Sequence, residues 1–180
     1  MNILITGASG MIGSALSTRL TQSGHQVFGL SRSDSSAPFH YDPINDRVHF
    51  STDTKLDAVV NLAGANIADR RWNIQRKEEI LNSRARLTRA LSQALSESQT
   101  PPHTLLSASA IGFYGNQCTA PTDEDCPPGD DFLAEVSVRW EEATAAATHA
   151  GIRTVLLRFG LVLNADGGVL KNLVMPGGLA

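Results

Sequence analysis

The sequence has few cysteines, no long apolar run and little net charge. Its 180 residues include two cysteines, Cys118 and Cys126, in a polar loop without zinc-ligand or CxxC spacing. We interpret them as incidental thiols in a reducing compartment, with a disulfide as the alternative. No apolar stretch is long enough to span a membrane. The formal net charge of -3 argues against non-specific binding to nucleic acid.

The overall composition is typical of a globular domain. Hydrophobic residues make up 42% of the chain and charged residues 18%. No repeat or linker divides the sequence, so we expect one nucleotide-binding domain over residues 1–180. We also expect no signal peptide, because an apolar run already begins at residue 2, and therefore predict a cytoplasmic protein.

A glycine-rich turn near the start of the chain separates an apolar run, residues 2–5, from an amphipathic segment, residues 14–22. In the turn TGASGMIG, the three glycines permit a sharp bend, a close approach to a diphosphate and packing of helix on strand. A second strand pattern over residues 26–30 completes the unit. It weakens the alternative that the glycines serve only a tight connection. The predicted cofactor-binding residues here are Gly7, Ser9, Gly10, Met11, Ile12 and Gly13.

The residues after the second strand indicate which dinucleotide binds. An Asp or Glu at this place would bind the 2′-hydroxyl of the adenine ribose. The sequence has Ser31 and Arg32 instead, and a guanidinium suits a 2′-phosphate. We therefore predict NADP as the cofactor, with NAD and a flavin less favoured. The alternative is that Arg32 is a solvated loop residue.

Strand and helix patterns alternate along the rest of the chain. Strands are predicted over residues 57–64, 103–109 and 152–159, and helices over 73–99 and 132–149. Asn73 can cap the first of these helices, and its charged run 76–79 is most simply a solvated face. Residues 34–55 contain two strand-like pieces, 39–41 and 48–50, and predict a short edge strand and loops. This alternation is typical of an α/β protein with a doubly wound parallel sheet, the Rossmann fold.

The strand over residues 57–64 ends in Leu62, Ala63 and Gly64. The small residues at its end would let the ribose and phosphates of a dinucleotide pass close to the backbone. We therefore assign these three residues to the cofactor site as well.

With these motifs in order, the chain resembles the extended short-chain dehydrogenase/reductases, and more closely their atypical nucleotide-sugar epimerase-like branch. The resemblance implies a Rossmann fold, a nicotinamide cofactor at the carboxyl ends of the strands, and oxidoreductase or epimerase activity. A nucleotide sugar is one candidate for the small-molecule substrate, and a homodimer is one candidate assembly. The matching segments are TGASGMIG, SRS, NLAGANIADRRW, SASAIGFYG, FLAEV with the later Trp140, and LRFGLVL with the later glycine pair.

The catalytic residues of the family match only in part. In typical members a Ser or Thr at the end of the fifth strand orients the reacting oxygen, and Ser109 matches it. The alternative for Ser109 is a small residue satisfied by the backbone. A Tyr and a Lys four residues apart then handle the proton, but Phe132 and Val136 stand at these positions and no YxxxK occurs in the chain. The usual proton relay is therefore absent.

Tyr114 is the nearest phenol to Ser109, so these two residues are the predicted catalytic pair. The alternative for Tyr114 is a packing role. A phenol with an ordinary pKa of about 10 needs a nearby cation to act near neutral pH. The nicotinamide charge of the cofactor, or an arginine such as Arg84 or Arg139, is predicted to supply it.

Members of this family carry further residues that build a substrate lobe, so we expect most of that lobe to be missing here, either because the gene product is shortened or because the sequence is a truncated form. Two readings follow. The first is an NADP-dependent oxidoreductase or a nucleotide-sugar epimerase-type enzyme. The second is a nicotinamide-nucleotide-binding sensor or interaction module without turnover, which would explain Phe132 and Val136 directly. We assign no metal ligands.

Overall fold

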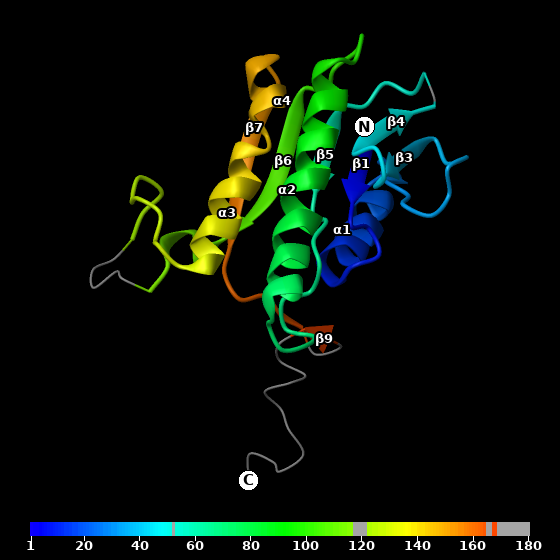
Figure 1. The fold of residues 1–180 in the computed structure, drawn as a ribbon. Helices are drawn as coiled ribbons and strands as arrows, with labels where there is room; N and C mark the ends of the chain where they lie inside the picture. Colours follow the sequence, from blue (N-terminus) through cyan, green and yellow to red (C-terminus); the bar gives the residue numbers. More distant parts are fainter. Residues whose placement is uncertain (52, 117–121, 165–166, 169–180) are drawn as a thin grey trace.

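The computed structural model describes residues 1–51, 53–116, 122–164 and 167–168, and its centre is a five-stranded parallel sheet (Figure 1). The strand order is β2-β1-β5-β6-β7, and every neighbouring pair runs parallel. The predicted doubly wound sheet is confirmed. The strands are β1 (Asn2–Thr6), β2 (Gln26–Gly29), β5 (Ala58–Asn61), β6 (Thr104–Ala110) and β7 (Arg153–Phe159).

Helices cover both faces of this sheet (Figure 1). Because the central strands are buried on both sides, β1 and β5 carry consecutive apolar residues over residues 3–5 and 58–60. Leu4 and Val59 face Leu91 and Leu95 of α2, whereas Ile5 faces α1. The helices are α1 (Met11–Gln22), α2 (Ile74–Ser96), α3 (Phe132–Glu142) and α4 (Ala145–His149), and a short 3-10 helix, η1 (Ile111–Tyr114), follows β6.

The strand-like pieces at residues 39–41 and 48–50 are strands, but they pair with each other and do not form the predicted single edge strand. They form an antiparallel hairpin of β3 (Phe39–Asp42) and β4 (Arg47–Phe50), which touches the main sheet through one bridge between Ser31 and His40. Phe39 and Tyr41 are buried, and the hairpin packs on α2. The chain pairs locally because alternate residues of both strands are apolar. A second small hairpin joins β8 (Leu163–Asn164) and β9 (Gly167–Gly168).

The segment predicted as one helix over residues 132–149 is two helices, α3 and α4. At the break, the hydroxyl of Thr144 donates to the carbonyl of Glu141 at 2.7 Å, and such a bond competes with the regular helix ladder. The backbone N–H of Ala147 also donates to the buried hydroxyl of Ser92 at 2.8 Å. The second of these contacts holds α4 against α2.

The predicted start of α2 is confirmed, because Asn73 Oδ1 accepts a hydrogen bond from the backbone N–H of Arg76 at 2.7 Å. The solvated face predicted for residues 76–79 is wrong in one respect. The Arg76 side chain is only 3% exposed, since the loop before α2 folds over it and Asp69 and Glu79 pair with its guanidinium.

Cys118 lies outside the described residues, so its predicted state is not addressed by the structure. Within the part of the chain that the structure describes, no helix combines the length and apolar character that crossing a bilayer requires.

Candidate nucleotide-binding site

The glycine turn between β1 and α1 forms a backbone cradle at the carboxyl edge of the sheet. Gly7 has a φ of +67°, and a Cβ there would lie 2.9 Å from the carbonyl oxygen of Leu62. A Cβ on Gly13 would lie 2.2 Å from the Gly7 carbonyl oxygen. Glycine is therefore required at both positions, because β5 and α1 each pack directly on the turn.

In the part of the chain that the structure describes, no side chain caps the amino end of α1. Gly10 is the N-cap, no side chain caps the helix, and the first turn holds no acidic residue. The first N–H groups of a helix lack partners within the helix and lie at its positive end, so they attract an anion. Ser9 and Gly10 are exposed, and Met11 and Ile12 are half-buried. The cradle thus presents the amino end of a helix, with exposed residues at its start, at the place where a diphosphate was predicted.

The strand order places this cradle at the switch point of the sheet. From β1 the chain goes to β2 on one side, and β5 lies on the other side. Ligands of open α/β sheets bind in the crevice that such a reversal creates. Leu62, Ala63 and Gly64 follow β5 directly, so the structure brings them to the same crevice as Gly7.

A buried polar network fixes the backbone beneath the crevice. The hydroxyl of Thr6 donates to Asn61 Oδ1 at 2.7 Å and accepts from the N–H groups of Leu62 and Ala63 at 3.1 and 3.2 Å. Asn61 Nδ2 in turn donates to Thr88 Oγ1 at 2.8 Å and to Ser107 Oγ at 3.0 Å. The network therefore links β1, β5 and β6 through three residues that are register neighbours, at the ends of β1 and β5 and the middle of β6.

Sequence reasoning missed this network, although a signal was available. Thr6, Asn61 and Ser107 each interrupt an apolar strand, and buried polar groups need hydrogen-bond partners. Three such interruptions on strands that meet at one edge predict mutual pairing.

Ser31 and Arg32 lie beside the cradle, after the end of β2. A Cβ on Gly29 would lie 3.8 Å from Cβ of Ala8, which shows how closely β2 approaches the glycine turn. The Ser31 hydroxyl accepts from the N–H of Asp34 at 3.0 Å. Arg32 is exposed and pairs with no carboxylate among the described residues. Its guanidinium is therefore available to a ligand.

Ser109 and Tyr114 belong to one network, but they do not touch each other. Ser109 is 2% exposed and its hydroxyl donates to Glu141 Oε1 at 2.6 Å. Arg158 binds both carboxylate oxygens of Glu141, from Nε at 2.9 Å and Nη2 at 3.0 Å. Nη1 of Arg158 donates to the phenol oxygen of Tyr114 at 2.8 Å. The hydrogen bonds thus run from Ser109 to Glu141, from Glu141 to Arg158 and from Arg158 to Tyr114.

The cation beside Tyr114 is Arg158, which sequence reasoning did not select. Arg158 lies directly across from Ser109 in the β6–β7 register, and its Cζ lies 3.5 Å from the ring centre of Phe113. Hydrogen bonding to Glu141 raises the pKa of Arg158, so the side chain stays charged. Of the two predicted cations, Arg139 lies 3.9 Å from Glu135 on an exposed helix face. Arg84 packs against the end of β5.

The helix positions of the missing Tyr–Lys pair hold groups that cannot transfer a proton. Val136 is buried at 4% exposure. Phe132 packs edge-to-face on Trp72 at 5.5 Å, and Lys77 Nζ lies 5.0 Å from the Phe132 ring centre. An ammonium is therefore present near the tyrosine position, but it comes from α2.

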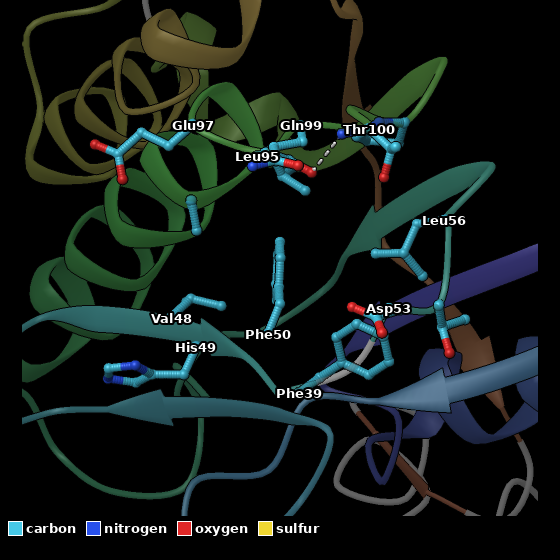
Figure 2. Close-up of a pocket in the computed structure, with 14 residues that line it drawn as sticks. Phe39, Val48, His49, Phe50, Asp53, Leu56, Leu95, Glu97, Gln99 and Thr100 are labelled. Carbon is cyan, nitrogen blue, oxygen red and sulfur yellow. Dashed lines mark hydrogen bonds between the residues drawn. The ribbon is translucent and has the colours of Figure 1, made fainter.

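A cavity of about 610 Å³ lies at the opposite, amino end of the sheet strands. It opens between the β3–β4 hairpin and the carboxyl end of α2, and Figure 2 shows Phe50 pointing from β4 toward the helix. Phe39, Leu56 and Leu95 also line it. Its lining includes none of the predicted cofactor or catalytic residues, so it does not bear on that site. Among the described residues, no group of three metal-ligating side chains occurs.

Comparison with known proteins gives consistent matches. A family model described as the NAD dependent epimerase/dehydratase family matches residues 3–166. The epimerase family protein Mb2239 of Mycobacterium bovis is 40% identical over 173 residues, which are 95% of this chain and 57% of that protein. The crystal structure of human epimerase family protein SDR39U1 (isoform2) with NADPH has a TM-score of 0.85 and 34% identity. It matches 98% of this chain, which covers 59% of the human one.

A nucleoside-diphosphate sugar epimerase from Corynebacterium glutamicum has a TM-score of 0.80 and 37% identity, over 99% of this chain and 38% of that one. This chain therefore spans less than two thirds of the length of these relatives. The resemblance drawn from the sequence motifs is confirmed, because the family model covers most of the chain. The chain belongs to the NAD dependent epimerase/dehydratase family.

Proposed function

We propose that this chain binds NADP(H) at the switch point between β1 and β5 and is the cofactor-binding part of an oxidoreductase or a nucleotide-sugar epimerase-type enzyme. One observation carries the binding: the uncapped amino end of α1 lies over a glycine turn, with exposed Arg32 beside it. The NADPH in the structure of the human relative supports the same cofactor.

The residues of the crevice fit a dinucleotide. The backbone from Gly7 to Gly13 would hold the diphosphate, because no described side chain caps the amino end of α1, where an anion is favoured. Ser31 and Arg32 would hold the adenosine end, where the guanidinium would pair with a 2′-phosphate. When bound, the nicotinamide supplies or accepts a hydride at the carboxyl edge.

For the proton we propose Tyr114, with Arg158 as the cation that assists it. A phenolate oxygen at this place would have a permanent positive charge 2.8 Å away. Ser109 would act indirectly, because its hydroxyl donates to Glu141, which in turn holds Arg158. Ser109 is thus a positioning residue in this proposal, and Tyr114 is the group that meets the substrate.

A nucleotide sugar is the proposed substrate class, supported by the description of the Corynebacterium neighbour as a nucleoside-diphosphate sugar epimerase. A cytoplasmic location agrees with the presence of only two cysteines. We also propose a homodimer, to be measured by analytical ultracentrifugation.

In the test, the purified protein is titrated with NADPH, NADH and FAD, and binding of each is measured by isothermal titration calorimetry. We expect saturable binding of NADPH, weaker binding of NADH and none of FAD. Tighter binding of NADH or FAD would overturn the cofactor proposal. Once the cofactor is fixed, hydride transfer is screened over carbonyl compounds and nucleotide sugars with the longest natural form of the protein.

The second candidate is a nicotinamide-nucleotide-binding sensor or interaction module. The observation that favours it is the apolar pair at the relay positions, since Val136 is buried and Phe132 packs on Trp72. NADPH binding without turnover of any carbonyl compound or nucleotide sugar would select this reading.

A further inference from the structure

The cavity between the β3–β4 hairpin and the carboxyl end of α2 has an apolar floor. Phe39, Leu56 and Leu95 line it, and all three are buried in the core. Phe50 packs edge-to-face on Phe39, with ring centres 5.6 Å apart, but its own side chain is only half-buried. In Figure 2 the Phe50 ring points from β4 toward α2. Part of an aromatic surface is therefore available to a ligand.

The rim of the cavity carries negative charge. Asp53 and Glu97 line it, and no Lys or Arg of the described part of the chain does so. Asp53 is exposed and pairs with no Lys or Arg among the described residues. Glu97 accepts a hydrogen bond from Nε2 of Gln93 at 2.6 Å, and this partner is neutral. His49 also lines the cavity, but its ring stacks on that of His40, with ring centres 6.2 Å apart, on the face of the hairpin that points away from the core.

The carboxyl end of α2 adds to the negative potential at this rim. The helix ends at Ser96, Glu97 is its C-cap, and its last turn holds no basic residue. The last carbonyls of a helix carry a partial negative charge, which a Lys or Arg in the last turn offsets. The helix end, Glu97 and Asp53 therefore all favour a cation at the same opening.

The size and chemistry of the cavity select one class of ligand. Its volume of about 610 Å³ lies in the range of small-molecule pockets, roughly 300–1,000 Å³. The floor favours an apolar body, and an ammonium above an aromatic ring gains a cation–π interaction. An anion would meet Asp53 and Glu97 as like charges. The ligand that fits is an apolar molecule with one positive charge.

We propose that this cavity binds a small organic cation with an aromatic body, of the arylalkylamine type. The aromatic body would pack on Phe50 and Leu95, and the ammonium would lie at Asp53. Glu97 and the end of α2 would add to the attraction. This inference goes beyond the proposed function, because the cavity lining includes none of the predicted cofactor or catalytic residues.

The test uses three indoles as probes. Tryptamine ends in an ammonium, tryptophol in a hydroxyl and indole-3-propionate in a carboxylate, so they share an apolar body and differ in charge. Isothermal titration calorimetry measures the Kd of each probe for the purified protein, at low and at high salt. Chemical shifts of the backbone amides of isotope-labelled protein locate the bound probe.

We expect tryptamine to bind at least about fivefold more tightly than tryptophol, and indole-3-propionate to bind more weakly than either. The advantage of tryptamine should shrink at high salt, because salt screens the attraction to exposed carboxylates. The amide shifts should change at Phe50, Leu95 and Thr100, which line the cavity, and not at Gly7 or Gly10 of the glycine turn.

Three variants separate charge from shape. Asp53→Asn and Glu97→Gln should each reduce the advantage of tryptamine over tryptophol at least about twofold, without changing the Kd of tryptophol. Glu78→Gln, at the exposed other end of α2, is the matched control and should change neither Kd. Ala94→Trp places an indole of the protein in the cavity and should abolish binding of all three probes.

The inference is overturned if tryptamine does not bind, if the three probes bind equally, or if the amide shifts change away from the cavity. Retained tryptamine binding in a folded Ala94→Trp protein would also overturn it. Should Ala94→Trp not fold, the amide shifts of the parent and the Kd values of Asp53→Asn still decide. If NADPH fails to bind the protein, the proposed function fails, whereas the tryptamine Kd decides this inference independently.

Discussion

The guanidinium of Arg158 donates a hydrogen bond to the phenol oxygen of Tyr114 at 2.8 Å. The two residues are 44 positions apart in the sequence, and β6 and η1 bring one of them to the strand that carries the other. Arg158 is itself held by both oxygens of Glu141, so the cation has a fixed direction. A fixed cation at a phenol is what the missing lysine supplies in typical members of the family.

Tyr114→Phe should therefore lower turnover at least about a hundredfold if the phenol transfers the proton. The substitution removes one oxygen and leaves the ring packing on Phe113 in place. The measurement is kcat under saturating cofactor, for a substrate found in the screen. Tyr41→Phe is the matched control, because Tyr41 lies in the β3–β4 hairpin. Equal rates for parent and Tyr114→Phe would assign Tyr114 to packing.

Breaking the network below Tyr114 should cost stability. The side chains of Arg158 and Glu141 are 18% and 10% exposed. Arg158→Met would leave the Glu141 carboxylate with little compensation, so we expect the free energy of unfolding to fall by about 3 kcal/mol in urea titrations. Arg139→Met breaks the exposed contact with Glu135 on the same helix, and should cost less than about 0.5 kcal/mol. Equal losses would show that the Arg158 contact is no stronger than a surface pair.

Local sequence patterns were sufficient to predict the cradle. The glycines of residues 7–13 lie between a strand and a helix, and the structure requires glycine at the first and last of these positions. The capping role of Asn73 was equally local, because the bond it accepts comes from Arg76, three residues on.

The contacts that join Ser109, Arg158 and Tyr114 could not be predicted in the same way. Arg158 meets Ser109 only through the register of β6 and β7, and no local pattern encodes a register between strands so far apart. The break before α4 likewise depends on Ser92. Its hydroxyl accepts a hydrogen bond from the N–H of Ala147, which is 55 residues further along the chain. The apolar spacing of residues 132–149 continues across that break, so periodicity alone predicts one helix.

Arg32→Ala should separate the two nicotinamide cofactors. The side chain is exposed, so its removal should leave the fold unchanged. Loss of a charge-assisted contact with the 2′-phosphate should weaken NADPH by about tenfold or more and leave NADH nearly unaffected. Isothermal calorimetry with both cofactors measures this. If the affinities for NADPH and NADH fall equally, or if neither falls, Arg32 does not contact the 2′-phosphate, and the basis for preferring NADP is removed.

Stability at high pH should depend on Tyr41. Burial first, and then the hydrogen bond to Asp46, raise the pKa of Tyr41 to about 12. The phenol of an unfolded chain titrates near pH 10, so the contribution of Tyr41 is complete below about pH 10 and is lost between about pH 10 and 12. We expect a loss of at most about 2 kcal/mol, because solvent reaches the hairpin.

Urea unfolding at several pH values, compared between the parent and Tyr41→Phe, isolates this residue from the other groups that titrate. The difference in unfolding free energy should shrink as the pH rises from about 10 to about 12. A constant difference over that range would show that Tyr41 titrates alike in the folded and unfolded states.

Gly10→Val tests the cradle itself. The backbone of Gly10 has a φ of -75° and a ψ of 171°, which any residue can adopt, and a Cβ there would lie 3.2 Å from one carbonyl oxygen, that of Gly7. The variant should therefore fold. The valine methyl groups would lie at the open end of α1, where they would block an approaching diphosphate, so NADPH affinity should fall at least about a hundredfold. Circular dichroism measures whether the variant folds, and isothermal titration calorimetry measures its NADPH affinity.

Gly13→Ala is the contrasting variant, since its Cβ would lie 2.2 Å from the Gly7 carbonyl oxygen and should disrupt the fold as well as the binding. A folded Gly10→Val protein with the NADPH affinity of the parent would show that the cofactor does not bind over this turn.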